Sequence, residues 1–543
     1  MTQNRFAAFV LLALILALAL RLPHIEGDPP AGDISRSASF LADEGIHGYN
    51  ALHWAITGDW YIADGFNPGV NTPVFMLFEY ALLRTFGVHL KTVRYGAVAC
   101  GLLSLVLLAR LLRRLSRRAA LMGGFLWAMA FPLVIYNRLA FIENVLLVFM
   151  LLLALLFVAF LERPQRLWPA VAGVAVFMAG WLTKPTLIFL LPAFGATLLY
   201  VRPTHHRRAT GLALLTAIVL VAALYFFWVR PYADDWAYYQ SIHMAERMPQ
   251  SLGEILLNYA RYFGHLKLFE FMPLIYGLAL VQFLGLAPAF LKREEQRPVV
   301  VLLVFWLVFG VGFLGFFAYS PPRYSLLLLP AVIGLAAMAL DQWLVGDRPV
   351  RLTGWMKAAY IALVLLQVAF GLYRYFAQGQ AYPSTALPAL ALLILPLWAR
   401  QGGLWRYALP VLIVLVQLGQ TVRYYVSMEF SLRDGMQKVA KFIHEQGRGP
   451  DSVLAGDSAM LFAFEARVRS IAVMYREDRL PVLFRRWRSD FLLLEDPAEL
   501  PRLQRLMPEY LRRLQPLAQF PLMNNYVHGR DAVLYRILPP KQD

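Results

Sequence analysis

The chain has 543 residues, of which 59% are hydrophobic and 16% are charged, and its mean hydropathy is +0.54. This composition excludes a disordered chain and argues against a purely soluble globule, whose apolar content is roughly 45–50%, so a multispan membrane protein remains. The net charge of +17 does not indicate nucleic-acid binding, because much of the Lys and Arg excess lies in short loops between apolar runs. The single cysteine, Cys100, excludes an intrachain disulfide.

Apolar runs of spanning length follow one another along most of the chain. The first, residues 6–20, follows Arg5 and resembles a signal peptide with a poor cleavage site, so we expect an uncleaved span. In all, the runs predict about thirteen transmembrane helices, each near the roughly 20 residues that a bilayer requires. The later runs lie near residues 94–112, 119–136, 144–161, 167–182, 185–201, 211–229, 272–291, 298–318, 324–345, 355–373, 385–399 and 407–423.

Clusters of Arg and Lys in the even-numbered loops predict a cytoplasmic N-terminus. The densest cluster is Arg110, Arg113, Arg114, Arg117 and Arg118. An odd number of spans then places the long loops 23–93 and 230–271, and the tail 424–543, on the periplasmic side.

The tail, residues 424–543, is less apolar and predicts a small periplasmic α/β domain, because strands alternate with helices. It contains no glycine-rich phosphate loop and no metal-ligand spacing, so a packing or docking role is the simpler interpretation. The predicted helices cover residues 431–445 and 501–514, and the predicted strands cover 452–455, 490–494 and 532–537.

The first outer loop contains two adjacent acids, Asp43 and Glu44, at the start of a predicted amphipathic helix that ends at Gly58. Acidic residues often occupy the first turn of a helix because they favour its dipole, and spacing alone supports this structural interpretation. The functional alternative is a pair of carboxylates at the membrane boundary.

Further ionisable residues lie at helix ends on the same predicted side: Arg138, Glu143, Lys184 and Arg323. Each alone could be a snorkelling or interfacial side chain, but their coincidence on one side indicates a site. A carboxylate can remove a proton from an attacking hydroxyl, and cations can hold a phosphate while its charge grows. This set predicts transfer of a group from a lipid-linked phosphate to an alcohol or a similar nucleophile.

Loop 230–271 is rich in Tyr, Trp and His, which predicts either interfacial anchors or a mobile lid that stacks on a sugar. The residues singled out as contacts of an acceptor or a lid are His47, His53, Tyr136, Tyr239 and His243. With Asp43, the first two histidines could reach a divalent metal ion. A surface position on the helix is the simpler interpretation, and metal dependence stays open.

Four segments, in this order, resemble the GT-C superfamily of membrane glycosyltransferases, especially the branch of protein O-mannosyltransferases and the lipid A aminoarabinose transferase. They are ADEGIHGYNALHWAITGDW (42–60), RLAFIENVLLVF (138–149), LTKPTLIFLLP (182–192) and PPRYSLLLLP (321–330). The sequence departs from the family where stretch 67–75 lacks a charge that often precedes a Pro-Pro-Leu segment, and where Pro185 follows Lys184.

The resemblance implies a helical GT-C domain over residues 1–423 and a periplasmic α/β domain over 424–543. It also implies a polyprenyl-phosphate sugar donor, inversion at the anomeric carbon, and a lipid, protein or glycan acceptor. Asp43 would be the catalytic base and Glu44 its support, and Glu143 stands where the family more often has Asp. The residues that would contact the donor phosphate are Arg138, Lys184, Arg323 and Tyr324.

Two other classes of function remain as alternatives. A lipid or polysaccharide transporter or flippase would place charged or helix-breaking residues near the bilayer midplane. Here the middle of each run is nearly all apolar, which favours the enzyme. A scaffold that presents the tail gives no reason for the acids and cations on one side.

Overall fold

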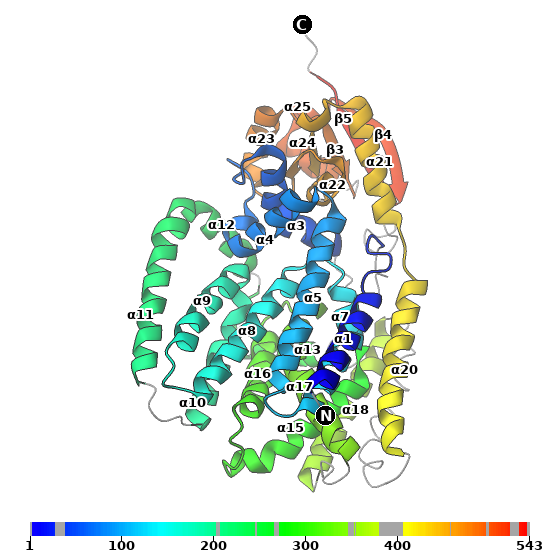
Figure 1. Cartoon of the computed structure of the whole chain (residues 1–543). Helices are drawn as coiled ribbons and strands as arrows, with labels where there is room; N and C mark the ends of the chain where they lie inside the picture. The colour runs from blue at the N-terminus through cyan, green and yellow to red at the C-terminus, as the bar shows by residue number, and fades with distance from the viewer. Residues whose placement is uncertain are drawn as a thin grey trace.

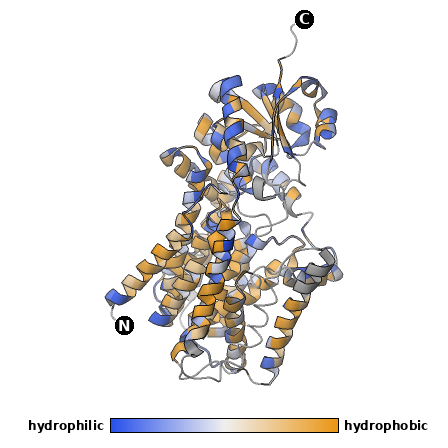
Figure 2. Cartoon of the chain, turned by 90° about the vertical axis from the view of Figure 1, so that its right-hand side faces the viewer, coloured by the Kyte–Doolittle hydropathy of each residue, from blue (hydrophilic) through white to orange (hydrophobic). Residues whose placement is uncertain are grey.

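The structure is a computed structural model that describes residues 3–27, 39–201, 207–244, 247–264, 271–345, 352, 354–378, 405–456, 458–495, 499–521 and 531–539. A body of long helices carries a smaller α/β domain at one end, and the N-terminus lies toward the other end (Figure 1). Apolar residues dominate the helices of the body, whereas polar and apolar residues mix in the α/β domain (Figure 2).

The helical part is built from α-helices and two short 3₁₀ segments that matter for the site. They are α1 (Gln3–Ala19), α3 (Ser39–Thr57), α4 (Pro73–Phe86), α5 (Leu90–Leu112), α6 (Arg117–Met129), α7 (Phe131–Tyr136), α8 (Ile142–Glu162), α9 (Trp168–Thr183), η2 (Pro185–Phe189), α10 (Leu190–Val201), α11 (Arg207–Leu224), α12 (Ala233–Met244), α13 (Leu252–Gly264), α15 (Pro273–Leu291), α16 (Pro298–Phe316), η5 (Pro322–Leu328), α17 (Leu329–Val345), α18 (Trp355–Gln378) and α20 (Trp405–Val426).

The prediction of a multispan membrane protein is confirmed. Within the described residues, seven helices are long and apolar enough to cross a membrane, and four shorter apolar helices accompany them. The predicted span at 385–399 lies outside the described residues. The segment Pro322–Val345 has 94% of its apolar window buried, so it runs through the middle of the body, and Arg323 lies at the start of this segment.

Helices α3 and α4 lie between the body and the C-terminal domain (Figure 1). Gly58 ends α3 as predicted, because its φ of +82° is a backbone conformation that favours glycine. The start of α3 differs from the expectation. The helix begins at Ser39, so Asp43 and Glu44 lie in its second turn, beyond the free N–H groups that a capping acid would bind.

The C-terminal domain contains a five-stranded mixed sheet in the order β2-β1-β3-β5-β4. The pairs β1–β2 and β1–β3 are parallel, and β3–β5 and β4–β5 are antiparallel. Its elements are α21 (Ser431–Gln446), β1 (Val453–Gly456), α22 (Ala459–Ala466), β2 (Arg469–Ala472), α23 (Leu480–Trp487), β3 (Phe491–Leu494), α24 (Leu500–Leu506), α25 (Pro508–Leu511), β4 (Leu514–Pro521) and β5 (Asp531–Ile537).

Strands β2 and β4 were not predicted, and the predicted helical stretch 501–514 is instead two short helices followed at Leu514 by β4. The segment LQPLAQFP contains Pro516 and Pro521, which argue against a central strand. It is nevertheless a strand because β4 lies at the sheet edge and pairs only with β5, where a missing N–H is tolerated.

Candidate active site

Four of the predicted site residues form one cluster at the end of the helical body that faces the C-terminal domain. Arg323 Nη1 lies 2.7 Å from Asp43 Oδ2, and Arg323 Nε lies 3.5 Å from Glu143 Oε1. Lys184 Nζ donates to Glu143 Oε1 at 2.5 Å. Between 0% and 12% of each side chain is exposed, so two acids and two cations share a space that is nearly closed to water.

Prolines explain why two of these residues lie outside regular helix. The residue before a proline is restricted to extended conformations, and Lys184 has φ −156° and ψ 126° directly before Pro185. Helix α9 therefore ends at Thr183, and Lys184 lies in the break between α9 and η2. Arg323 similarly follows two prolines, of which Pro322 begins η5.

Aromatic rings form one wall of this cluster. Lys184 Nζ lies 4.1 Å from the ring centre of Tyr324, and the Arg323 guanidinium lies 5.4 Å from the same ring. Phe141 lies on another side of Arg323, at 5.5 Å. Such rings hold cations in place without neutralising them, which suits a site that must receive an anion.

The electrostatics of Asp43 are set by burial and by nearby cations. Burial raises the pKa of Asp43 above its usual value, while the positive charges of Arg323, Lys184 and Arg247 act in the opposite direction. Arg247 lies in loop 230–271, and its guanidinium lies 4.6 Å from the centre of the Tyr319 ring. Arg247 was not among the residues predicted from the sequence, because loop 230–271 contains several cations and nothing local distinguishes this one.

Glu44 does not face this cluster. Its Oε1 accepts from Arg94 Nε at 3.0 Å and its Oε2 from Arg94 Nη2 at 2.7 Å, with both side chains buried. Oε1 also accepts from the backbone N–H of Ala140 at 2.7 Å. Successive side chains on a helix point about 100° apart, so Glu44 binds an ion partner in the core while Asp43 faces the cluster.

Arg138 also lies elsewhere. Its guanidinium donates to the backbone carbonyls of Arg21 at 2.9 Å, Pro23 at 2.5 Å and His24 at 2.5 Å, and to the hydroxyl of Tyr425 at 2.6 Å. These bonds fasten the segment after α1 to α20. Arg138 therefore holds two segments of the chain together. It does not lie in the cluster of Asp43 and Arg323, where a contact with the donor phosphate was expected.

Two of the predicted acceptor or lid residues lie near the cluster. His47 follows Asp43 by one helical turn and interacts electrostatically with Glu143. Tyr239, on α12, interacts electrostatically with Asp43 and Tyr324.

The other three predicted acceptor or lid residues are placed differently. Tyr136 is buried in the core, with its ring 6.1 Å from that of Phe141. His53 stacks on Trp487 of the C-terminal domain at 5.4 Å, and burial lowers its pKa to about 4. The side chain of His243 lies outside the described part of the chain.

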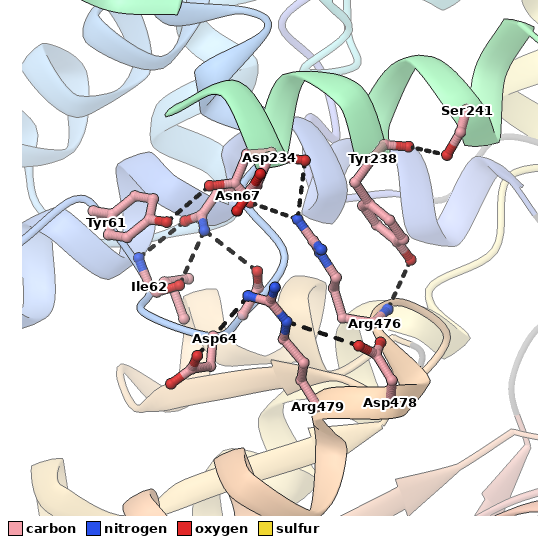
Figure 3. A network of polar contacts seen from close by, with 12 residues as sticks. Tyr61, Ile62, Asp64, Asn67, Asp234, Tyr238, Ser241, Arg476, Asp478 and Arg479 are labelled. Carbon is pink, nitrogen blue, oxygen red and sulfur yellow. Dashed lines mark hydrogen bonds and ion pairs between the residues drawn. The ribbon is translucent and has the colours of Figure 1, made fainter. Parts of the chain in front are cut away.

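Polar contacts tie helix α12 to both the first outer loop and the C-terminal domain (Figure 3). Asp235 accepts from Tyr61 Oη at 2.8 Å and from Arg476 Nη2 at 3.1 Å. The backbone N–H of Arg476 donates to Tyr238 Oη at 2.7 Å, and its guanidinium lies 4.0 Å from the Tyr238 ring. The C-terminal domain thus holds α12, and with it Tyr239, at the cluster.

The cluster suits an anion better than a divalent metal ion. Each carboxylate already binds a cation, Asp43 to Arg323 and Glu143 to Lys184. In the part of the chain that the structure describes, no group of three or more His, Cys, Asp or Glu side chains could hold a metal ion.

Part of the sequence matches a known family. Residues 70–228 match the model of the family described as dolichyl-phosphate-mannose-protein mannosyltransferase. This stretch includes Glu143 and Lys184. No curated protein sequence matches the chain.

A solved bacterial structure shares the fold along nearly the whole chain. ArnT from Cupriavidus metallidurans bound to undecaprenyl phosphate has a TM-score of 0.60 at 16% identity, with 99% of each chain covered. The apo state of the same protein gives 0.60 at 17% identity, with 98% of each chain covered. An oligosaccharyltransferase from Archaeoglobus fulgidus, tethered with an acceptor peptide, gives 0.46 at 11% identity, covering 97% of this chain and 71% of that one.

The family match and the ArnT-like fold confirm the resemblance to GT-C membrane glycosyltransferases.

Proposed function

We propose that this membrane glycosyltransferase moves a sugar from a polyprenyl-phosphate donor to an acceptor hydroxyl, with inversion at the anomeric carbon. The acceptor is a lipid, a protein or a glycan. The observation that carries the proposal is the ion pair between Asp43 and Arg323, beside the pair of Glu143 and Lys184, in one buried cluster. This cluster brings a candidate base, Asp43, next to two candidate ligands of the donor phosphate, Lys184 and Arg323.

The reaction uses these residues in one displacement. The ionised carboxylate of Asp43 takes the proton of the acceptor hydroxyl while the acceptor oxygen attacks the anomeric carbon. The bond from that carbon to the phosphate oxygen breaks, and the polyprenyl phosphate leaves with the electron pair. Lys184 and Arg323 stabilise the charge that grows on the departing phosphate. Glu143 orients both cations, because it contacts each of them.

Charge balance supports this assignment. Asp43 and Glu143 oppose three cations, Lys184, Arg323 and Arg247, so the ionised site has one net positive charge. A donor phosphodiester has one negative charge. After transfer, Asp43 is protonated and the site has two net positive charges, which match a phosphate monoester whose second pKa is about 6. The site is therefore close to neutral before and after the reaction.

The orientation and the number of spans belong to the same proposal. Arginines at the end of the body away from the C-terminal domain support a cytoplasmic N-terminus. We infer about thirteen spans, with the catalytic cluster and the C-terminal domain on the periplasmic side of an inner membrane. The donor chain and the surrounding lipids would then contact the apolar sides of the helices.

Binding of undecaprenyl phosphate to the purified protein tests this proposal. Lys184→Met should weaken binding about tenfold or more, since it removes a charged phosphate contact. Lys91→Met is the matched control, because Lys91 is exposed and pairs at 3.4 Å with Glu26, outside the cluster. Equal affinities for wild type and Lys184→Met would refute the phosphate role.

A further inference from the structure

Two cavities lie at the C-terminal end of α5, which is the end away from the candidate active site. Helix α5 begins next to His89, which binds Glu465 of the C-terminal domain, and its 23 residues span roughly 33 Å. The first cavity has a volume of about 490 Å³ and lies between α1 and the end of α5. Val10 and Val106 contribute to its apolar wall, and it also includes Arg110, Arg113 and Arg114.

The second cavity lies on the other side of α5, against α8 and the start of α9, and has a volume of about 390 Å³. It shares Arg110 and Arg114 with the first cavity and adds Arg163 and Arg166. Its wall is otherwise mostly apolar and includes Trp168, a residue type that is common at membrane interfaces. The two cavities are thus neighbours, with Arg110 and Arg114 lining both of them.

The charge of this region is strongly positive. The two cavities contain five arginines and one acid, Glu162. Arg114 forms an ion pair with Glu162, which leaves four arginines without an acid in the cavities. Arg113 lies 5.0 Å over the ring of Phe6, so this guanidinium is held at the first cavity without being neutralised.

Membrane topology alone does not require this arrangement. The preference for cytoplasmic Lys and Arg places cations in loops, but it does not place them around cavities with apolar walls. An apolar wall beside a cationic rim fits a phospholipid, whose acyl chains cover the wall while its phosphate binds the arginines.

We propose that the two cavities together bind one phospholipid with two phosphates, cardiolipin. One phosphate occupies each cavity, and Arg110 and Arg114 lie between them. Four arginines without an acid partner match two phosphodiester groups, each of which can accept paired N–H donors from guanidinium groups. This site lies apart from the catalytic cluster, and the inference does not depend on the proposed reaction.

Lipid titration of the purified full chain, followed by native mass spectrometry, tests the site. Wild type should bind cardiolipin about tenfold or more tightly than phosphatidylglycerol, which has one phosphate. The double variant Arg110→Gln/Arg113→Gln should lose about tenfold or more of the cardiolipin affinity. Arg117→Gln/Arg118→Gln is the control, because it removes the same charge from the nearby start of α6 but neither residue lines either of these two cavities.

An uncharged change keeps the test informative if the double variant folds poorly. Val106→Trp fills part of the first cavity with no change in charge and should also weaken cardiolipin binding. Equal losses in both arginine double variants would reveal a general attraction to a basic surface and overturn the site. Equal affinity of wild type for the two lipids would overturn the two-phosphate assignment, and unaltered binding in Val106→Trp would contradict the place of the acyl chain.

Discussion

Replacing Glu44 by Gln should destabilise the protein far more than replacing its neighbour Asp43 by Asn. Glu44 is fully buried and makes two charged hydrogen bonds with Arg94, at 3.0 and 2.7 Å, with both partners at most 1% exposed. The amide has the same shape but no charge, so Arg94 loses its buried anionic partner, although the carbonyl of Ile25 still accepts from it.

The magnitude follows from the loss of one partner of a buried ion pair, which costs about 3–5 kcal/mol. Asp43→Asn should cost much less. Without the carboxylate of Asp43, Arg323 still has a second acid, Glu143, at 3.5 Å. Turnover should show the opposite order. Asp43→Asn should lower kcat by about 10²- to 10⁴-fold, because it removes the general base, whereas Glu44→Gln should change kcat much less.

Thermal unfolding in detergent, followed by tryptophan fluorescence, and turnover per folded molecule measure both effects. We expect Glu44→Gln to lower Tm by several degrees and keep most of the turnover, and Asp43→Asn to keep Tm and lose turnover. Equal losses of Tm in the two variants, or an inactive but fully stable Glu44→Gln protein, would refute this division of roles.

Two further predictions concern pH and the contact with the C-terminal domain. The acidic limb of kcat/KM should lie above the ordinary aspartate pKa of about 3.9, because burial raises the pKa of Asp43 and activity is lost as pH falls through it. Arg323→Gln should move that limb further upward, and an unmoved limb in a pH–rate profile would contradict Asp43 as the base. Arg476→Ala should raise KM for the donor, because it releases α12. Arg479→Ala should leave KM unchanged, because the side chain of Arg479 forms longer ion pairs, at 3.9 Å with Asp64 and 3.8 Å with Asp478, and none with α12 among the described residues. Equal KM values for these two variants would argue against the role of Arg476.

Parts of the site followed from local sequence. Pro185 restricts Lys184 to an extended conformation, and Pro322 begins the segment that contains Arg323, so both cations could be placed at breaks between helices. The edge strand β4 could not be predicted in this way, because its two prolines are tolerated only through its position in the sheet.

The sequence by itself determined the class of protein, most of the candidate spans and the helix ends at which acids and cations gather. It could do so because a bilayer demands apolar runs of about 20 residues and proline and glycine act locally. Only the tertiary structure decided that Asp43 faces Arg323 while Glu44 faces Arg94, that Arg138 binds backbone carbonyls, and that Arg247 acts on Asp43. An ion partner depends on how each helix is rotated against its neighbours, and hydropathy along the chain does not record the partner of a charged side chain.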